Sequence, residues 1–239
     1  MIGCHCAVCE SRDLKDKRLR SSILVQSANT TLVVDTTPDF RTQMLRVHND
    51  KLDAVLFTHS HKDHVAGLDD VRAYNYFQHK PMQVFATEQT QAQLRREFYY
   101  AFENNGYAGL PQLDIRTIGY QPFIVNDIPV IPVKVWHHKM EVLGFRFGKF
   151  TYITDANKID AGQKELIKGS EVMVINGLRK EKHISHFSLG EAVDLAEELQ
   201  VPRTYITHIS HQLGLHEEVE RELPQHIRLA YDGLSLDIT

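Results

Sequence analysis

The segment "FTHSHKDHVAG", residues 57–67, places three histidines and one aspartate within six positions, directly after the apolar run "LDAVLF". Such a run has the length and composition of a short buried strand. Side chains alternate between two faces in an extended segment, so His59 and His61 project to the same side. Asp63 and His64 follow where the chain turns toward a helix. The pattern indicates a layered α/β fold that carries metal ligands where a strand ends.

These side chains also indicate a type of chemistry. Imidazole and carboxylate ligands suit zinc, manganese or iron. Two such ions about 3.5–4 Å apart hold a bridging water as hydroxide at neutral pH. We therefore predict a binuclear, metal-dependent hydrolase with two catalytic transition-metal ions.

The three cysteines of the chain, Cys4, Cys6 and Cys9, all lie in "CHCAVC". An odd number within six residues cannot form an internal disulfide framework, and spacing this tight is typical of metal ligation. His5 lies between two of the cysteines and is expected to point away from them. The fourth ligand is therefore expected from elsewhere in the fold; three unrelated thiols are the alternative.

Composition narrows the class of protein. The 239 residues show no repeat or linker, so we predict one hydrolase domain over 1–239, with a zinc loop at 1–10. No apolar stretch approaches the ~20 residues of a membrane span, and the polar N-terminus favours a cytoplasmic protein. The net charge of −4 argues against a nucleic-acid partner held by bulk electrostatics.

Alternating strand-like and helical runs predict an α/β fold of two sheets between helices. The local patterns predict a hairpin turning at Ala28-Asn29, a helix that opens with a capping box at Ser188, and a second hairpin about Asp232-Gly233. Mainly strands are expected over 111–155, with turns near 126–127 and 148–149. Aromatic residues of 98–107 suit core packing or contact with a second copy in a homodimer.

The motif H-x-H-x-D-H resembles the signature of the metallo-β-lactamase superfamily, whose fold is an αββα sandwich of two mixed sheets flanked by helices. Later positions resemble the phosphodiesterases of that family: a histidine six residues before Gly144-Phe145, an aspartate closing "TYITD" and a histidine closing "YITH". His137 is set aside, because neighbouring strand residues face opposite ways. The resemblance implies catalytic metal ligands at His59, His61, Asp63, His64, His138, Asp155 and His208.

Two further features, the N-terminal cysteine cluster and the segment "SHFSLGEAV", resemble the PhnP-type cyclic phosphodiesterase branch. The resemblance implies a structural zinc held by Cys4, Cys6, Cys9 and His211. It also implies that His186, in "SHFSLGEAV", acts as general acid or phosphate contact, just before a helix N-terminus that favours anions. Members of the branch begin with a strand and a glycine-rich loop ahead of the first cysteine. Either the native start lies upstream of Met1 or the domain lacks its first strand.

The predicted function is a phosphodiesterase that cleaves a small cyclic or strained phosphate ester through a hydroxide bridging two metals, zinc or manganese or else iron. His186 and Asp63 are the predicted catalytic residues, and Asp63 is also a metal ligand. One alternative is an iron protein similar to the pyrroloquinoline quinone biosynthesis protein B. The other is a tRNA 3′-processing ribonuclease, which the lack of a basic insertion disfavours.

Overall fold

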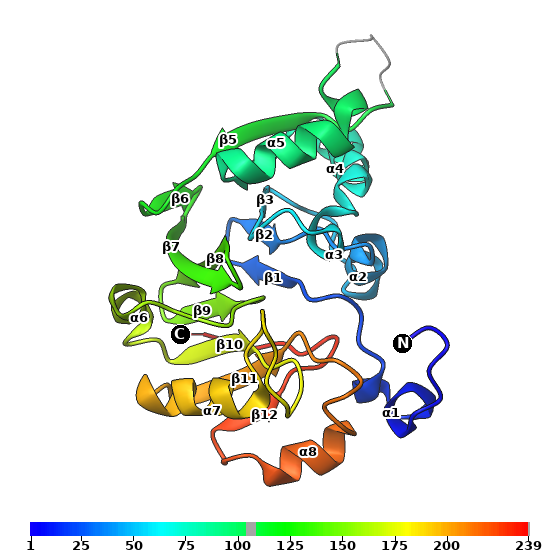
Figure 1. Cartoon of the computed structure of the whole chain (residues 1–239). Helices are drawn as coiled ribbons and strands as arrows, with labels where there is room; N and C mark the ends of the chain where they lie inside the picture. Colours follow the sequence, from blue (N-terminus) through cyan, green and yellow to red (C-terminus); the bar gives the residue numbers. More distant parts are fainter. Residues whose placement is uncertain (104–108, 239) are drawn as a thin grey trace. The chain divides into compact units, whose positions relative to one another are not determined.

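The computed structural model describes residues 1–103 and 109–238, and its chain forms two compact units (Figure 1). Unit 1 comprises Met1–Leu19 with Val130–Thr239, and unit 2 comprises Arg20–Pro129. The expectation of one functional domain over 1–239 remains a prediction.

Unit 2 contains a mixed sheet with the strand order β1-β2-β3-β4-β5. β1 and β2 are antiparallel and the following pairs are parallel. The predicted turn at Ala28-Asn29 is confirmed, because Gln26 at the end of β1 pairs with Thr31 at the start of β2. The strands are β1 (Ile23–Gln26), β2 (Thr31–Val34), β3 (Ala54–Leu56), β4 (Met82–Ala86) and β5 (Leu113–Thr117).

Helices of unit 2 follow the strands along the chain and bury an apolar core. Thr87 caps α5, since its side chain accepts a hydrogen bond from the Thr90 N–H. Gly67, at the end of "FTHSHKDHVAG", leaves no room for a Cβ, which would meet the Thr37 carbonyl and Phe40. The remaining elements are α2 (Phe40–Arg46), α3 (Lys62–Val65), η2 (Leu68–Val71), α4 (Arg72–Gln78), α5 (Glu88–Glu97), η3 (Tyr99–Ala101) and β6 (Phe123–Val125).

The strand β7 (Ile128–His137) carries the chain into unit 1, where the strand order is β12-β11-β10-β9-β8-β7. β7, β8 and β9 pair antiparallel, whereas β9 to β12 pair in parallel, so this sheet is also mixed. The predicted turn at Gly148-Lys149 is confirmed, with Phe147 paired to Phe150. The strands are β8 (Met140–Phe147), β9 (Phe150–Ile153), β10 (Val172–Asn176), β11 (Arg203–Thr207) and β12 (Ile227–Leu229).

The helix α7 (Leu189–Glu198) confirms the predicted capping box. Ser188 accepts from the Glu191 N–H, and the Glu191 carboxylate accepts from the Ser188 N–H. The buried face of α7, which includes Leu195, packs against β10 and β11 (Figure 1). The other helices of unit 1 are α1 (Ala7–Glu10), η1 (Leu14–Asp16), α6 (Ala161–Ile167) and α8 (His216–Glu222).

The predicted hairpin about Asp232-Gly233 is wrong. β12 pairs in parallel with β11, and residues 230–238 form no further strand. Gly233 has a φ of 88° and makes a turn in which the Leu234 N–H bonds to the Tyr231 carbonyl, 3.1 Å away. Asp232-Gly233 does form a turn, but a turn signal does not supply a partner strand.

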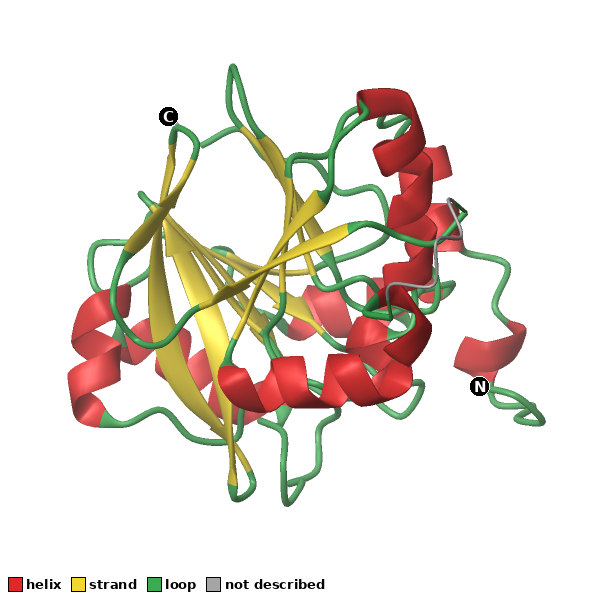
Figure 2. Cartoon of the chain, turned by 90° about the horizontal axis from the view of Figure 1, so that it is seen from above, coloured by secondary structure: helices red, strands yellow, loops and turns green. Residues whose placement is uncertain are grey.

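The predicted fold class, α/β with two mixed sheets flanked by helices, is confirmed. Figure 2 shows the twist of the strands, which follows from their chirality. Within 1–103 and 109–238, no helix is long and apolar enough to cross a membrane. Of the aromatic residues of 98–107, Tyr107 lies outside the described residues, Phe98 is buried and Tyr99 is exposed.

Candidate functional site

The "histidine cluster" of unit 2 comprises His59, His61, Asp63 and His64. They occupy the loop after β3 and the first turn of α3. The ring centroid of His59 lies 4.6 Å from that of His61 and 4.3 Å from that of His64. An Asp63 oxygen lies 3.8 Å from His64 Nε2. The four predicted ligands are therefore adjacent in the folded unit.

Asp35 forms hydrogen bonds to the histidine cluster and to Thr58 beside it, and it was not identified from the sequence. Its fully buried carboxylate accepts from the Thr58 N–H at 2.9 Å, from the Thr58 hydroxyl at 2.8 Å and from His64 Nδ1 at 2.7 Å. Thr58 Oγ1 also lies 2.9 Å from His59 Nδ1. Because Nδ1 of His64 is the donor to Asp35, its Nε2 carries the lone pair that a metal requires.

Burial raises the pKa of Asp35, although His64 opposes that shift. The residue also has a φ of 65° directly after β2, an unusual conformation for a residue with a side chain. The only signal in the sequence was an acidic residue that ends the apolar run "TLVVD". An isolated aspartate after a strand is also typical of an ordinary turn, which explains why it was missed.

A second group of candidate ligands lies in unit 1. His208 Nε2 is 3.3 Å and His186 Nδ1 is 3.7 Å from the same Asp155 oxygen. The His186 ring stacks on His208 at 4.9 Å and lies 4.6 Å from the His137 ring. One ligand atom from each of His137, Asp155 and His186 lies within 4.8 Å of the others. Imidazole and carboxylate together suit zinc, manganese or iron, so this donor set fits such an ion.

The choice of His138 over His137 is wrong for this group. His137 pairs with Met140 at the end of the β7–β8 hairpin, so His138 occupies the two-residue turn with a φ of 57°. His138 is exposed, and its N–H bonds to the Asn157 side chain at 2.8 Å. His137 lies on the side that faces Asp155 and His186, and its Nδ1 is 2.8 Å from the Ser185 carbonyl. Counting from Gly144 takes no account of this turn, so it selects His138 and not the neighbouring histidine that lies beside Asp155 and His186.

Two other candidate ligands of unit 1, Asp155 and His208, have a strained backbone. Asp155 and His208 follow β9 and β11 with φ values of 55° and 52°. Residues with side chains adopt such angles at a cost, and they cluster at functional sites. Asn176 holds the loop after Asp155, since its side-chain amide makes two hydrogen bonds to the Ala156 backbone, at 2.8 and 2.9 Å. The sequence did not single out Asn176, which ends the buried strand β10.

His186 lies two residues before Ser188, the N-cap of α7, as predicted. The residue is buried, with 9% of its surface exposed, and its Nδ1 makes no hydrogen bond within the described chain. Burial lowers the pKa of His186 to about 3, although the nearby Asp155 carboxylate raises it. In this geometry the ring is neutral at pH 7, the form in which histidine binds metals or donates one N–H.

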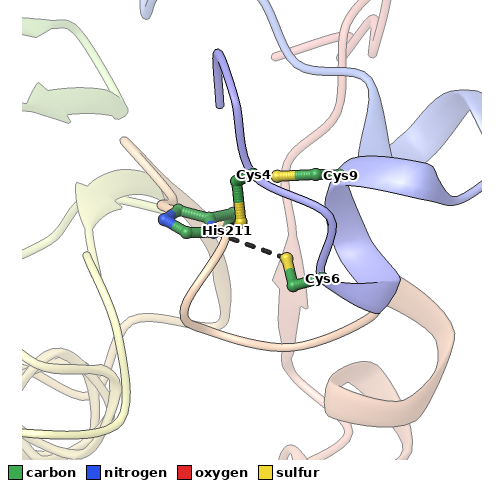
Figure 3. A group of neighbouring side chains, drawn as sticks. All are labelled: Cys4, Cys6, Cys9 and His211. Atoms are coloured by element: carbon green, nitrogen blue, oxygen red, sulfur yellow. Dashed lines mark hydrogen bonds between the residues drawn. The ribbon is translucent and has the colours of Figure 1, made fainter.

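The "cysteine site" of unit 1 comprises Cys4, Cys6, Cys9 and His211 (Figure 3). Cys4 Sγ and Cys6 Sγ each lie 3.4 Å from His211 Nδ1, and all four ligand atoms lie within 4.8 Å of one another. His5 points away, as expected, and its exposed ring contacts Glu10 at 2.9 Å. The fold therefore brings the predicted fourth ligand to the cysteines.

The spacing of the cysteine site fits zinc. Tetrahedral bonds of about 2.3 Å to sulfur and 2.0–2.1 Å to nitrogen put sulfur and nitrogen about 3.6 Å apart. The observed separations of 3.4 Å are close to this value. The hydrogen bond with His211 lowers the pKa of Cys6 to about 6, which favours the thiolate that binds a metal.

Comparison with known proteins shows the family. The beta-lactamase superfamily domain matches residues 30–209 of the 239. This chain belongs to that superfamily. A crystal structure described as a new diphosphatase from the PhnP family is 38% identical, with a TM-score of 0.93, over 100% of this chain and 92% of that one. The predicted resemblance to the PhnP type is confirmed.

Two other relatives bear on the assignment. An octanoyltransferase of Porphyromonas gingivalis (strain ATCC BAA-308 / W83) is 39% identical over 98% of this chain, which spans about half of that protein, 48%. The zinc-bound PqqB of Methylobacterium extorquens has a TM-score of 0.77 and 19% identity, over 99% of this chain and 95% of that one. At that identity the likeness concerns the fold alone.

Proposed function

We propose that the protein is a metal-dependent hydrolase that cleaves a phosphorus–oxygen bond in a small phosphodiester. The observation that carries the proposal is the adjacency of His59, His61, Asp63 and His64 after β3, in a chain of the beta-lactamase superfamily. The diphosphatase of the PhnP family favours a second candidate substrate, a diphosphate. In both substrates a phosphorus–oxygen bond breaks, with an alkoxide as the leaving group of the ester and a phosphate as that of the diphosphate.

As the family motif implies, we assign catalytic metal ligands to the histidine cluster of unit 2 and, in unit 1, to Asp155 and His208, with His137 replacing His138. Two bound transition-metal ions would supply an activated water and Lewis-acid stabilisation of the phosphate oxygens. Asp35 and Thr58 hold His64 and His59 in their ring orientations. Their buried hydrogen bonds preset the ligands, so little ordering is left to metal binding.

His186 is the proposed contact to the leaving group. In hydrolysis the water oxygen bonds to phosphorus, the ester bond breaks, and the departing oxygen takes up a proton. His186 lies beside Asp155, and it precedes the N-terminus of α7, where backbone N–H groups favour an anion. A neutral His186 would donate its N–H to the departing oxygen.

The similarity to an octanoyltransferase does not lead us to propose acyl transfer for this chain. The chain corresponds to 48% of that protein, whereas its match to the diphosphatase covers 92% of the latter. About half of that protein therefore has no counterpart in this chain, so its activity does not carry over.

The direct test is turnover by protein loaded with zinc or manganese. We expect hydrolysis of bis-p-nitrophenyl phosphate and of 2′,3′-cyclic nucleotides, or of a nucleoside diphosphate if the second candidate is correct. A chelator should abolish the rate, and added metal should restore it. Protein that carries bound iron and is inert on all three substrates would support the PqqB-like alternative.

We also propose that the cysteine site holds a structural zinc, so that loaded protein contains about three metal ions per chain. Cys6→Ser is expected to remove one of these ions and to lower the melting temperature, because structural zinc contributes folding free energy directly. Elemental analysis and thermal unfolding measure the two effects. The rate per folded molecule should persist. An unchanged metal content in Cys6→Ser would contradict the assignment.

A further inference from the structure

A cluster of buried charged and polar groups connects the N-terminal segment to α8 within unit 1. The side chains of Asp16 and Arg18 are 2% and 13% exposed, and His216 is 2% exposed. Asp16 Oδ1 accepts from the His216 N–H at 2.8 Å and lies 3.8 Å from the Arg18 guanidinium. Buried charged and polar groups are costly unless they are paired, so Asp16, Arg18 and the polar imidazole of His216 depend on one another.

The hydrogen bonds define the state of His216. Arg18 Nη2 donates to His216 Nδ1 at 2.8 Å, so the imidazole proton resides on Nε2, which faces Glu220 Oε2 at 2.6 Å. Burial lowers the pKa of His216, although Glu220 opposes that shift. A neutral ring is consistent with an Nδ1 that accepts the hydrogen bond from Arg18. Arg18 Nε also reaches the Ala230 carbonyl at 3.3 Å. The guanidinium thus binds two separate segments of the unit.

The position of this cluster relates it to the cysteine site. Asp16 follows Cys9 by seven residues, and His216 follows His211 by five. The two segments that supply the cysteines and the histidine are therefore joined a second time, a short distance beyond the ligands. Lys17 adds a bond to the same loop, since its Nζ donates to the Cys9 carbonyl at 2.8 Å.

We propose that Asp16, Arg18 and His216 form a clamp that presets the cysteine site for zinc. The inference rests on the proposed structural zinc. With the clamp in place, the cysteine loop lies beside His211 before the ion binds. Without it, zinc must order the loop from a large ensemble, and the lost conformational entropy weakens binding.

The test is metal affinity at the cysteine site. Because the chain has three cysteines, all in this site, the thiolate charge-transfer absorption of cobalt(II) reports this site alone. We expect Arg18→Gln to weaken cobalt and zinc binding about 10–100-fold in competition with a chelator, the range found for residues that orient metal ligands. Amide hydrogen exchange over 4–16 should accelerate in the metal-free variant, while α7 stays protected.

The matched control is Arg221→Gln, which breaks an exposed ion pair with Glu217 on the same helix and should leave the affinity unchanged. If Arg18→Gln does not fold, Arg18→Lys is measured in its place. Lysine keeps the positive charge but cannot make both guanidinium hydrogen bonds, to His216 and to the Ala230 carbonyl. Wild-type cobalt affinity in a folded Arg18 variant would overturn the clamp. A wild-type protein without the cobalt–thiolate absorption would instead overturn the zinc site itself.

Discussion

His61→Ala is expected to lower the rate of phosphate ester hydrolysis by about 10³-fold or more, together with the catalytic metal content. A metal site supplies several kcal/mol of transition-state stabilisation, and each 1.4 kcal/mol corresponds to about tenfold in rate. His61 contributes an imidazole beside His59, with 4.6 Å between the ring centroids. The metal content, measured by elemental analysis, and the turnover rate should fall together. Asp63→Asn should behave in the same way.

The control for this change is His48→Asn, an exposed residue of unit 2 with a φ of 49° that asparagine also tolerates. It should leave metal content and rate unchanged. In unit 1 the matched pair is His137→Ala and His138→Asn, of which only the first should lose metal. Full metal content and activity in His61→Ala would remove the histidine cluster from the proposed mechanism.

His186→Ala is expected to slow hydrolysis of an ester with a poor, alkoxide leaving group by about 10²–10⁴-fold, while metal content is retained. The departing alkoxide needs a proton or a hydrogen bond, and His186 is the buried imidazole beside Asp155 and the start of α7. An ester of p-nitrophenol needs little such help and should suffer much less. The hydrolysis rates of wild type and His186→Ala on the two ester types, together with the metal content of each protein, measure this difference.

Other outcomes for His186→Ala assign different roles. Equal losses on both esters with metal retained would make His186 a phosphate contact. Loss of metal would make it a ligand, a role that its grouping with His137 and Asp155 also permits. No loss on either ester would leave it without a part in catalysis.

Local patterns in the sequence predicted much of the framework and part of the candidate site. The spacing of His59, His61, Asp63 and His64 after an apolar run needs only a strand that leads into a helix, and both are present. The capping box at Ser188 and the turn at Ala28-Asn29 depend on bonds between near neighbours. Elements with strong local signals could therefore be predicted without knowledge of the fold.

Hairpin geometry decided what the spacing could not. Whether His137 or His138 lies beside Asp155 depends on where the β7–β8 turn falls, and the structure puts His138 in the turn. A shift of one residue reverses the face of every side chain in a strand. The Asp232-Gly233 error has a related origin, since a turn signal does not reveal whether a partner strand follows.

The residues that support the ligands required the tertiary structure. Asp35 reaches Thr58 and His64 because β2 and β3 lie side by side in the sheet. The Arg18–His216 pair joins residues nearly two hundred positions apart. Sequence alone determined which side chains had the chemistry to bind a metal, because ligand type and spacing are local properties. Only the tertiary structure decided which buried polar groups orient them, since desolvation and hydrogen bonding depend on neighbours that are distant in the chain.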